Sequence, residues 1–325
     1  MSIALGLDVG ATKILAVAVN GDGNVIDEFR AKSSNSPRRL FDSLEEATVV
    51  LVESLRPRSE ELVGIGVGVP GLIDTHGVLH ETVNLPAVCG TAVAAELTRR
   101  FDRAFGRREG FRLIVDNDGM CSAAGEIAFG AAQGLSDAIV ITLGTGIGGG
   151  IIAGGRLLHG GRGFAGEIGH MVVEVDGPLC TCGRHGCWEQ FVAGAGHARL
   201  AREAIAAGKA TRVVELAGGR VEAVRSEHIF QAARAGDLEA WGIVDTIARY
   251  LALGIANLAE ALDPLAVIIG GGISRDSDLF LPLTEQYFAK TRRGSGERAV
   301  SLRSADLGSR SGAIGAAVLA LGLVA

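Results

Sequence analysis

The sequence predicts an α/β protein made of two similar lobes. Residues 3–30 alternate apolar runs with the turn sequences Asp-Val-Gly-Ala-Thr and Asn-Gly-Asp-Gly, a pattern typical of a β-meander. Residues 137–158 repeat the same plan of apolar strand, glycine turn and apolar strand. Mixed helical and strand-like sequence follows each copy, and 325 residues exceed the usual size of a single hydrophobic core. We therefore expect two lobes that face one another across a cleft.

Hydrophobic spacing predicts most of the other elements in chain order. Helical spacing predicts helices at residues 38–56, 91–104 and 119–132, two long helices within 228–262, and a closing helix over 311–325. Continuous apolar runs predict buried strands at residues 61–70, 111–118 and 264–273. We expect a small lobe of residues 1–118 plus 311–325 and a large lobe of residues 119–310, with hinges near residues 119 and 310.

The composition argues against several classes of function. A formal net charge of −6 gives no general attraction to nucleic-acid phosphates or to an anionic membrane surface. The apolar stretches contain glycines or are shorter than the roughly 20 residues of a membrane span. The N-terminal sequence lacks the features of a signal peptide, and five cysteines, an odd number, do not suit a disulfide framework. We expect a cytoplasmic protein whose partners include neither nucleic acid nor a membrane.

Three glycine-containing turns are candidate phosphate-binding sites. The first turn contains Gly10 and exposes backbone N–H groups. Thr12 and Lys13 can contact phosphate oxygens there, and Asp8 can hold Mg²⁺ through water. Taken alone, this segment fits a plain hairpin turn equally well. The other two turns consist of Gly144, Thr145 and Gly146, and of Gly270, Gly271 and Gly272. Glycines let a backbone approach an anion closely, and no GxxxxGK[ST] segment offers a P-loop instead.

A set of four residues has the composition of a structural zinc site. His170 lies in the segment Gly-Glu-Ile-Gly-His, and Cys180, Cys182 and Cys187 follow within residues 180–187. Zn²⁺ takes sulfur and nitrogen ligands tetrahedrally, and a closed Cys₃His set leaves no open position for water. We expect a zinc-binding loop over about residues 170–187. The alternative is three buried thiols without metal.

The same two segments carry a resemblance to a known family. Gly-Glu-Ile-Gly-His at 166–170 and Cys-Thr-Cys-Gly-Arg-His-Gly-Cys-Trp-Glu at 180–189 stand in the order and spacing typical of the ROK family (repressor, open reading frame, kinase). The resemblance covers essentially the whole chain. It implies a two-lobed actin-like, duplicated ribonuclease H-like ATPase fold with an interlobe cleft, and ATP-dependent phosphorylation of a hexose. The paired phosphate turns likewise resemble the superfamily of sugar kinases, heat-shock ATPases and actin.

The family's functional residues can be placed on this sequence one by one. The resemblance implies that Asp118 is the catalytic base and that Asn117 beside it holds sugar hydroxyls. His170 would have two roles, with one ring nitrogen on zinc and the other toward the sugar. The further sugar-binding residues that the resemblance implies are Pro70, Gly71, Asn84, Glu167 and Glu189.

The resemblance leaves the substrate and the class of function open. Glucose to glucose 6-phosphate is the first reaction to expect, but kinases for fructose, mannose or N-acetylhexosamines share the scaffold. The sequence departs from the family pattern at Ala11, where the family has glycine, and at Gly119, where it has asparagine or alanine. A non-catalytic, sugar-responsive regulator is the alternative from another class. It usually carries an N-terminal helix-turn-helix, and Asp8 lies too near the chain start to leave room for one.

For the oligomeric state, the phosphoryl donor and four further histidines, only general expectations are possible. By resemblance we expect a homodimer or homotetramer, and ATP as the donor in preference to polyphosphate. His76, His80, His159 and His228 belong to no partnered motif, so we expect solvated or loop positions for them.

Overall fold

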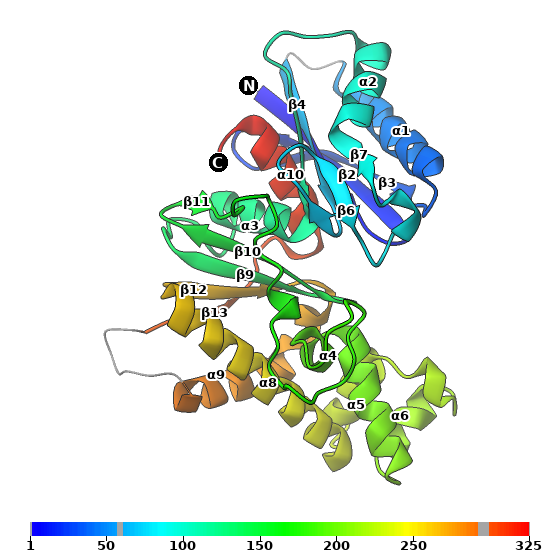
Figure 1. The fold of residues 1–325 in the computed structure, drawn as a ribbon, viewed down its shortest axis with the longest axis vertical. Coiled ribbons are helices and arrows are strands. Elements are labelled where there is room, and N and C mark those ends of the chain that lie inside the picture. The colour runs from blue at the N-terminus through cyan, green and yellow to red at the C-terminus, as the bar shows by residue number, and fades with distance from the viewer. Residues whose placement is uncertain (1, 57–60, 292–298, 325) are drawn as a thin grey trace. The chain divides into compact units, whose positions relative to one another are not determined.

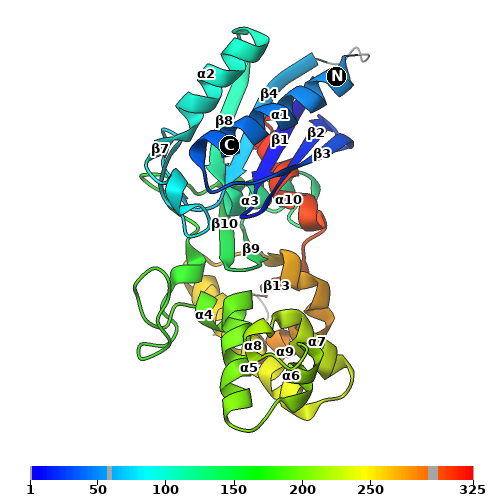
Figure 2. The same ribbon diagram turned by 90° about the vertical axis from the view of Figure 1, so that its right-hand side faces the viewer.

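The computed structural model describes residues 2–56, 61–291 and 299–324. The chain forms two compact units: unit 1 is Met1–Val140, Gly149–Gly166 and Ala305–Ala325, and unit 2 is Ile141–Gly148 and Glu167–Ser304. Figures 1 and 2 label their elements. The hinges expected near residues 119 and 310 stay predictions, because a compact unit does not identify a hinge.

Unit 1 is built on a five-stranded sheet of strand order β3-β2-β1-β4-β8. β1 pairs antiparallel with β2 and parallel with β4, while β4 pairs parallel with β8, so the predicted meander and both predicted strands are confirmed. β4 is buried as predicted, but β8 is an edge strand and mostly half-buried. The strands are β1 (Ser2–Val9), β2 (Lys13–Asn20), β3 (Val25–Lys32), β4 (Glu61–Val69) and β8 (Arg112–Asn117).

The two faces of this sheet are covered by different helices because side chains alternate along a strand. Leu5 and Leu7 of β1 belong to the core that also holds Leu44 of α1 (Pro37–Leu55). On the other face, Gly6 and Gly66 lie directly against α10 (Ser311–Leu321), where a Cβ at either position would overlap the helix backbone. Figure 2 shows α1 along one face of the sheet. The alternating glycines of β4 are therefore the contact surface for a closely packed helix.

The remaining elements of unit 1 connect these layers. Buried Glu126 of α3 accepts hydrogen bonds from the backbone N–H groups of Ala131 (2.9 Å), Asp306 (3.2 Å) and Leu307 (3.1 Å), which holds the returning C-terminal segment. The three-stranded sheet β5-β6-β7 was not predicted. The elements are β5 (Leu72–Ile73), β6 (Val78–Glu81), η1 (Pro86–Val88), β7 (Thr91–Ala92), α2 (Val93–Phe105), α3 (Asp118–Phe129) and η5 (Gly308–Arg310).

The second five-stranded sheet has the order β11-β10-β9-β12-β13 and repeats the strand plan of the first. In both sheets the third, second and first strands of a meander are followed by two later strands, so the predicted duplication is confirmed. β10 pairs antiparallel with β11, and β12 pairs parallel with β13. The strands are β9 (Ala138–Leu143), β10 (Ile147–Ala153), β11 (Arg156–Leu157), β12 (Ala266–Gly270) and β13 (Ser301–Ser304).

Unit 2 contains the other helices. α8 (Leu238–Leu262) packs along α9 (Ser277–Thr291), as Figure 1 shows. In the described part of the chain, α8 alone has the length and composition to cross a membrane, but 61% of its most apolar window is buried, as in a core helix. The others are η2 (Ile168–His170), α4 (Glu189–Val192), α5 (Gly194–Ala206), α6 (Thr211–Leu216), η3 (Val221–Ala223), α7 (Ser226–Arg234) and η4 (Gly272–Asp276).

Candidate active site

The carboxyl ends of β1, β4 and β8 bring polar groups into one row of unit 1. Asp8 pairs in register with Gly68, and Gly68 with Asp116, so the two carboxylates stand on one face of the sheet, two strands apart. Asn117 and Asp118 continue from β8 into α3. Parallel strands that end at one edge are the usual position for ligand contacts in α/β proteins.

Asn117 is fixed by hydrogen bonds on both sides of its amide. Its Oδ1 accepts the N–H groups of Gly119 (2.8 Å) and Met120 (3.2 Å) and so caps α3, while its Nδ2 donates to the carbonyl of Gly71 (3.0 Å). Asp118 Oδ1 accepts the Gly119 N–H at 2.9 Å. A Cβ at Gly119 would lie 2.6 Å from the backbone nitrogen of Gly149, which explains why this chain has glycine after the predicted base.

A histidine that sequence reasoning set aside lies behind this dipeptide. His159 Nε2 is 2.8 Å from Asp116 Oδ2, and Asp116 Oδ1 accepts the N–H of Asn117 at 2.8 Å. The hydrogen bond to Asp116 raises the pKa of His159 above its ordinary value, against the lowering effect of burial. His159 lies in a loop and His80 is exposed, as expected, but both have partners that no sequence motif indicated. The Nε2 of His80 is 2.8 Å from Asp74 Oδ2.

Asp8 and the following turn form the first predicted phosphate site. Burial raises the pKa of Asp8 to about 6, although Lys13 acts to lower it. The carboxylate lies over the start of α10, where a Cβ at Gly312 would be 2.9 Å from its carboxyl carbon. Gly10 donates its N–H to the carbonyl of Lys13 (2.9 Å), which leaves Ala11, Thr12 and Lys13 exposed. A carboxylate beside such a turn suits a hydrated Mg²⁺. No motif in the sequence indicates the contact of Gly312 with Asp8.

The predicted sugar residues of unit 1 lie in different surroundings. Gly71, after Pro70, has φ +118, and a side chain there would overlap the carbonyl of Glu81, so only glycine fits. Its carbonyl holds Asn117, which joins these two predicted positions. Asn84 is exposed and forms no hydrogen bond with any residue in the described ranges.

In unit 2 the two other glycine turns lie beside each other. Gly271 has φ +89 and lies against the carbonyl of Leu143, the residue before Gly144. Gly144 donates its N–H to the carbonyl of Gly146 (2.9 Å) and accepts one from Gly194 at the start of α5 (2.9 Å). Thr145 at the tip is exposed. Gly144–Gly146 and Gly270–Gly272 thus form one glycine-rich surface.

The four predicted zinc ligands meet in unit 2. One ligand atom from each of His170, Cys180, Cys182 and Cys187 lies within 4.8 Å of all the others. Cys180 Sγ is 3.6 Å from His170 Nδ1, and Cys182 Sγ is 3.6 Å from Cys187 Sγ. Tetrahedral ligands at about 2.3 Å (sulfur) and about 2.0 Å (nitrogen) lie roughly 3.5–3.8 Å apart, so the cluster fits Zn²⁺. Nδ1 is the ring nitrogen that faces the thiols.

The loop that carries the thiols is shaped by its own backbone. Gly183 (φ +84) and Gly186 (φ +68) provide its turns, and Cys180 donates its N–H to the carbonyl of Arg184 at 2.8 Å. Burial acts to raise the pKa of Cys182, but hydrogen bonds from Arg184 and from the other thiols lower it to about 6. One thiolate is thus available near neutral pH before metal binds.

Glu189 connects the zinc cluster with the glycine turn. Its Oε2 accepts the N–H of Ile147 (3.1 Å), and its Oε1 lies 3.9 Å from Cys180 Sγ. A Cβ at Gly146 would overlap this carboxylate. The preceding residue, Trp188, is fully buried and donates Nε1–H to the carbonyl of Tyr250 in α8 at 2.7 Å, which anchors the segment. On the other side of the cluster, Glu167 Oε2 is 3.9 Å from His170 Nε2.

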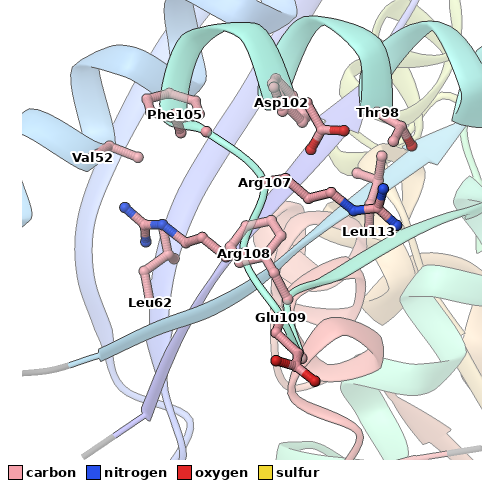
Figure 3. Close-up of a pocket in the computed structure, with 13 residues that line it drawn as sticks. Val52, Leu62, Thr98, Asp102, Phe105, Arg107, Arg108, Glu109 and Leu113 are labelled. Atoms are coloured by element: carbon pink, nitrogen blue, oxygen red, sulfur yellow. The ribbon is translucent and has the colours of Figure 1, made fainter.

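A separate cavity of about 950 Å³ lies at the opposite strand ends of unit 1. It is lined by Leu62 at the start of β4, Leu113 at the start of β8, and Arg107 and Arg108 of the loop after α2 (Figure 3). None of the predicted site residues lines it.

Two sheets of one plan, each with a glycine turn between its first two strands, define an actin-like fold of the sugar-kinase type. The crystal structure of a ROK family glucokinase from Streptomyces griseus, in complex with glucose and AMPPNP, superposes with a TM-score of 0.83 at 34% identity and covers 98% of this chain and 99% of that chain.

This chain belongs to the ROK family, whose family model matches residues 4–322, as the sequence predicted. A glucokinase of Streptomyces coelicolor is 34% identical over 326 residues, which is 98% of each chain. An N-acetylmannosamine kinase of Escherichia coli is 32% identical over 321 residues, again 98% of each chain.

Proposed function

We propose that this protein transfers the γ-phosphoryl group of ATP to a hydroxyl of a hexose, with glucose to glucose 6-phosphate as the first reaction to test. The observation that carries the proposal is the position of Asp118. Asp118 directly follows the parallel strand β8. The side-chain amide of the adjacent Asn117 donates a hydrogen bond to the carbonyl of Gly71, itself a predicted sugar position. Similarity to a glucokinase over nearly the whole chain supports glucose.

In the proposed mechanism Asp118 is the general base. It accepts the proton of the attacking hydroxyl while Asn117 and the Pro70–Gly71 turn orient the sugar. Backbone N–H groups of the glycine turns and the side chains of Thr12 and Lys13 contact the phosphates. When bound, Mg²⁺ neutralises charge on the transferred group, and Asp8 would hold it through water. Positioning and charge stabilisation supply most of the acceleration.

The zinc cluster has a structural role in this mechanism. Zn²⁺ on His170 Nδ1 would fix the ring and leave Nε2, which lies 3.9 Å from Glu167, to contact a sugar hydroxyl together with that carboxylate. Glu189 and Asn84 complete the proposed sugar set. Asp118 belongs to unit 1 and His170 and Glu189 to unit 2, so their convergence on one sugar is part of the proposal.

Two alternatives remain as candidate functions. A kinase for an N-acetylhexosamine has the support of the similar E. coli enzyme. N-acetylmannosamine differs from glucose at carbon 2, in the substituent and in its configuration, and a few polar groups of a site can distinguish the two. A sugar-responsive regulator has less support, because Asp8, Thr12 and Asp118 are all present. We further propose a cytoplasmic homodimer or homotetramer without nucleic-acid or membrane partners.

The test is a coupled assay of ADP release with ATP, Mg²⁺ and a panel of hexoses. We expect the highest kcat/KM with glucose, and the panel includes fructose, mannose, N-acetylglucosamine and N-acetylmannosamine. A higher kcat/KM for another sugar would replace glucose within the same proposal. Absence of turnover with every sugar, in protein shown to contain zinc, would overturn it.

A further inference from the structure

His159 and Asp116 form an ion pair behind the proposed base. His159 Nε2 lies 2.8 Å from Asp116 Oδ2, and the two side chains are 35% and 9% exposed. The other carboxylate oxygen accepts the N–H of Asn117 at 2.8 Å. Both oxygens of Asp116 therefore have partners, one in the backbone next to Asp118 and one in a loop 43 residues further along the chain.

Other charged side chains of unit 1 act in the same region as the His159–Asp116 pair. Burial holds the pKa of the Cys121 thiol well above its ordinary value, and the nearby carboxylates of Asp116, Asp8 and Asp118 raise it further. Lys13 is the cation that acts on Asp8. For Asp116 the cation is His159, whose protonated form the pair favours. Without His159, the Asp116 side chain, 9% exposed, would lose the hydrogen-bond partner of its Oδ2, two residues from the base.

The loop of His159 is itself fixed within unit 1. The carbonyl of His159 accepts the N–H of Ala165 at 3.1 Å, which closes the segment on itself. Gly163, with φ +95, lies against the backbone of Asp74, and Gly166, with φ +94, lies against the carbonyl of Gly149. The imidazole is therefore presented to Asp116 from a supported position, and the loop continues directly into Glu167 of the zinc-side motif.

We propose that His159 is a positioning residue for phosphoryl transfer: it holds and neutralises Asp116, and Asp116 in turn fixes the backbone from which Asn117 and Asp118 project. The inference rests on the proposed function of Asp118. His159 touches neither sugar nor nucleotide in this scheme, so its effect reaches the reaction only through Asp116. A shift of about 1 Å in the position of a base or its neighbour can lower the reaction rate by about 10²-fold.

Two substitutions of His159 test the contributions of its hydrogen bond and of its charge separately. His159→Gln keeps a donor of similar reach without the charge, and we expect a loss in kcat/KM of only about threefold. His159→Ala removes both, and we expect a loss of about 10- to 100-fold, shared between kcat through Asp118 and the hexose KM through Asn117. Asp116→Asn added to His159→Ala replaces the unpaired carboxyl group with a neutral amide whose Oδ1 can still accept the N–H of Asn117, and it should recover at least about fivefold of that loss.

The pair His80–Asp74 supplies a matched control. It has the same atoms, Nε2 and Oδ2, at the same 2.8 Å, but His80 is 49% exposed. The pair borders the His159 loop, with Asp74 against Gly163 and the His80 ring 5.5 Å from that of Phe164, so it tests whether support of the loop alone affects the reaction. His80→Ala should change kcat/KM by less than about twofold, because a surface pair contributes little.

The experiment measures ADP release with glucose, ATP and Mg²⁺, together with Tm, for the wild type and these variants. A loss of turnover in His159→Ala, recovered by Asp116→Asn at unchanged Tm, supports the proposal. Wild-type kinetics in His159→Ala would overturn it, as would a loss that Asp116→Asn deepens additively or one that only follows a lower Tm. An inactive wild type is a different result, because it would overturn the proposed function itself.

Discussion

The two five-stranded sheets repeat one strand plan, yet their corresponding turns carry different chemistry. The turn between β1 and β2 has a carboxylate before it, Asp8, and an ammonium after it, Lys13. The turn between β9 and β10 has only Gly144, Thr145 and Gly146, and its carboxylate, Glu189, comes from α4. A duplicated scaffold thus fixes where a turn lies, while the local sequence decides whether it offers charge or bare backbone.

The largest effect should come from Asp118, the acid that follows β8 of the first sheet. We expect Asp118→Asn to lower kcat by about 10²- to 10⁴-fold, the usual cost of losing a general base. Glucose affinity measured by calorimetry should remain within a few fold of the wild-type value, because an asparagine can still accept a hydrogen bond from a sugar hydroxyl. A variant with wild-type kcat would contradict the role of Asp118.

The next effect tests the part of unit 2 that has no counterpart in unit 1, the zinc cluster. Cys182→Ser should lower zinc content and reduce kcat/KM for glucose at least about tenfold, because the metal orients His170 and supports Glu189. Metal analysis and the coupled assay measure both quantities. Cys89→Ser, at an exposed cysteine outside the cluster, is the control and should match the wild type. Full activity in Cys182→Ser protein without zinc would refute the orienting role.

A smaller effect distinguishes the two glycines of the second turn. An added Cβ at Gly146 would overlap the Glu189 carboxylate, whereas at Gly144 the nearest atom, the carbonyl oxygen of Gly146, is 3.9 Å away. Overpacking of this kind costs about 1–3 kcal/mol, so we expect Gly146→Ala to lower Tm and raise the glucose KM about tenfold. Gly144→Ala should keep the wild-type Tm. Equal Tm values for the two variants would show that Glu189 does not depend on Gly146.

The smallest effect concerns the half-buried carboxylate of Asp8, near the end of β1 and just before the first turn. The folded-state pKa of Asp8 is about 6, above its ordinary value of 3.8, so the folded state holds the proton more tightly. The stability from this group is present below about pH 4 and is lost as pH rises through 6. Asp8→Asn should therefore raise Tm by about 2–4 °C at pH 8 and leave it unchanged at pH 4, measured by thermal unfolding without Mg²⁺. A Tm gain of equal size at both pH values would contradict the burial of this charge.

Much of the fold followed from local patterns. The meander, β4, the strand that ends at Asn117 and the long helix α8 lie where apolar runs, turn residues and helical spacing predicted them, whereas α7 has only nine residues instead of forming a second long helix. The two-residue strands β5 and β7 lack enough residues for any period to appear. Pro282 inside α9 and the four-residue β13 gave similarly weak signals.

The candidate site was predictable where a motif is contiguous in sequence and not where the fold assembles it. His170 and the three cysteines stand within 18 residues, and metal chemistry links them. His159 and Asp116 are 43 residues apart, and no spacing rule joins them. The contact of Gly312 with Asp8 is likewise made only by the returning chain.

The most direct test of the account is a crystal structure of Asp118→Asn with glucose and AMPPNP bound. We predict one glucose with a hydroxyl within about 2.6–3.2 Å of the residue 118 side chain. The same sugar should form hydrogen bonds with His170 Nε2 and Glu189 and face the γ-phosphate. A glucose bound by residues of one unit alone, with the side chain of residue 118 turned away from it, would contradict the account.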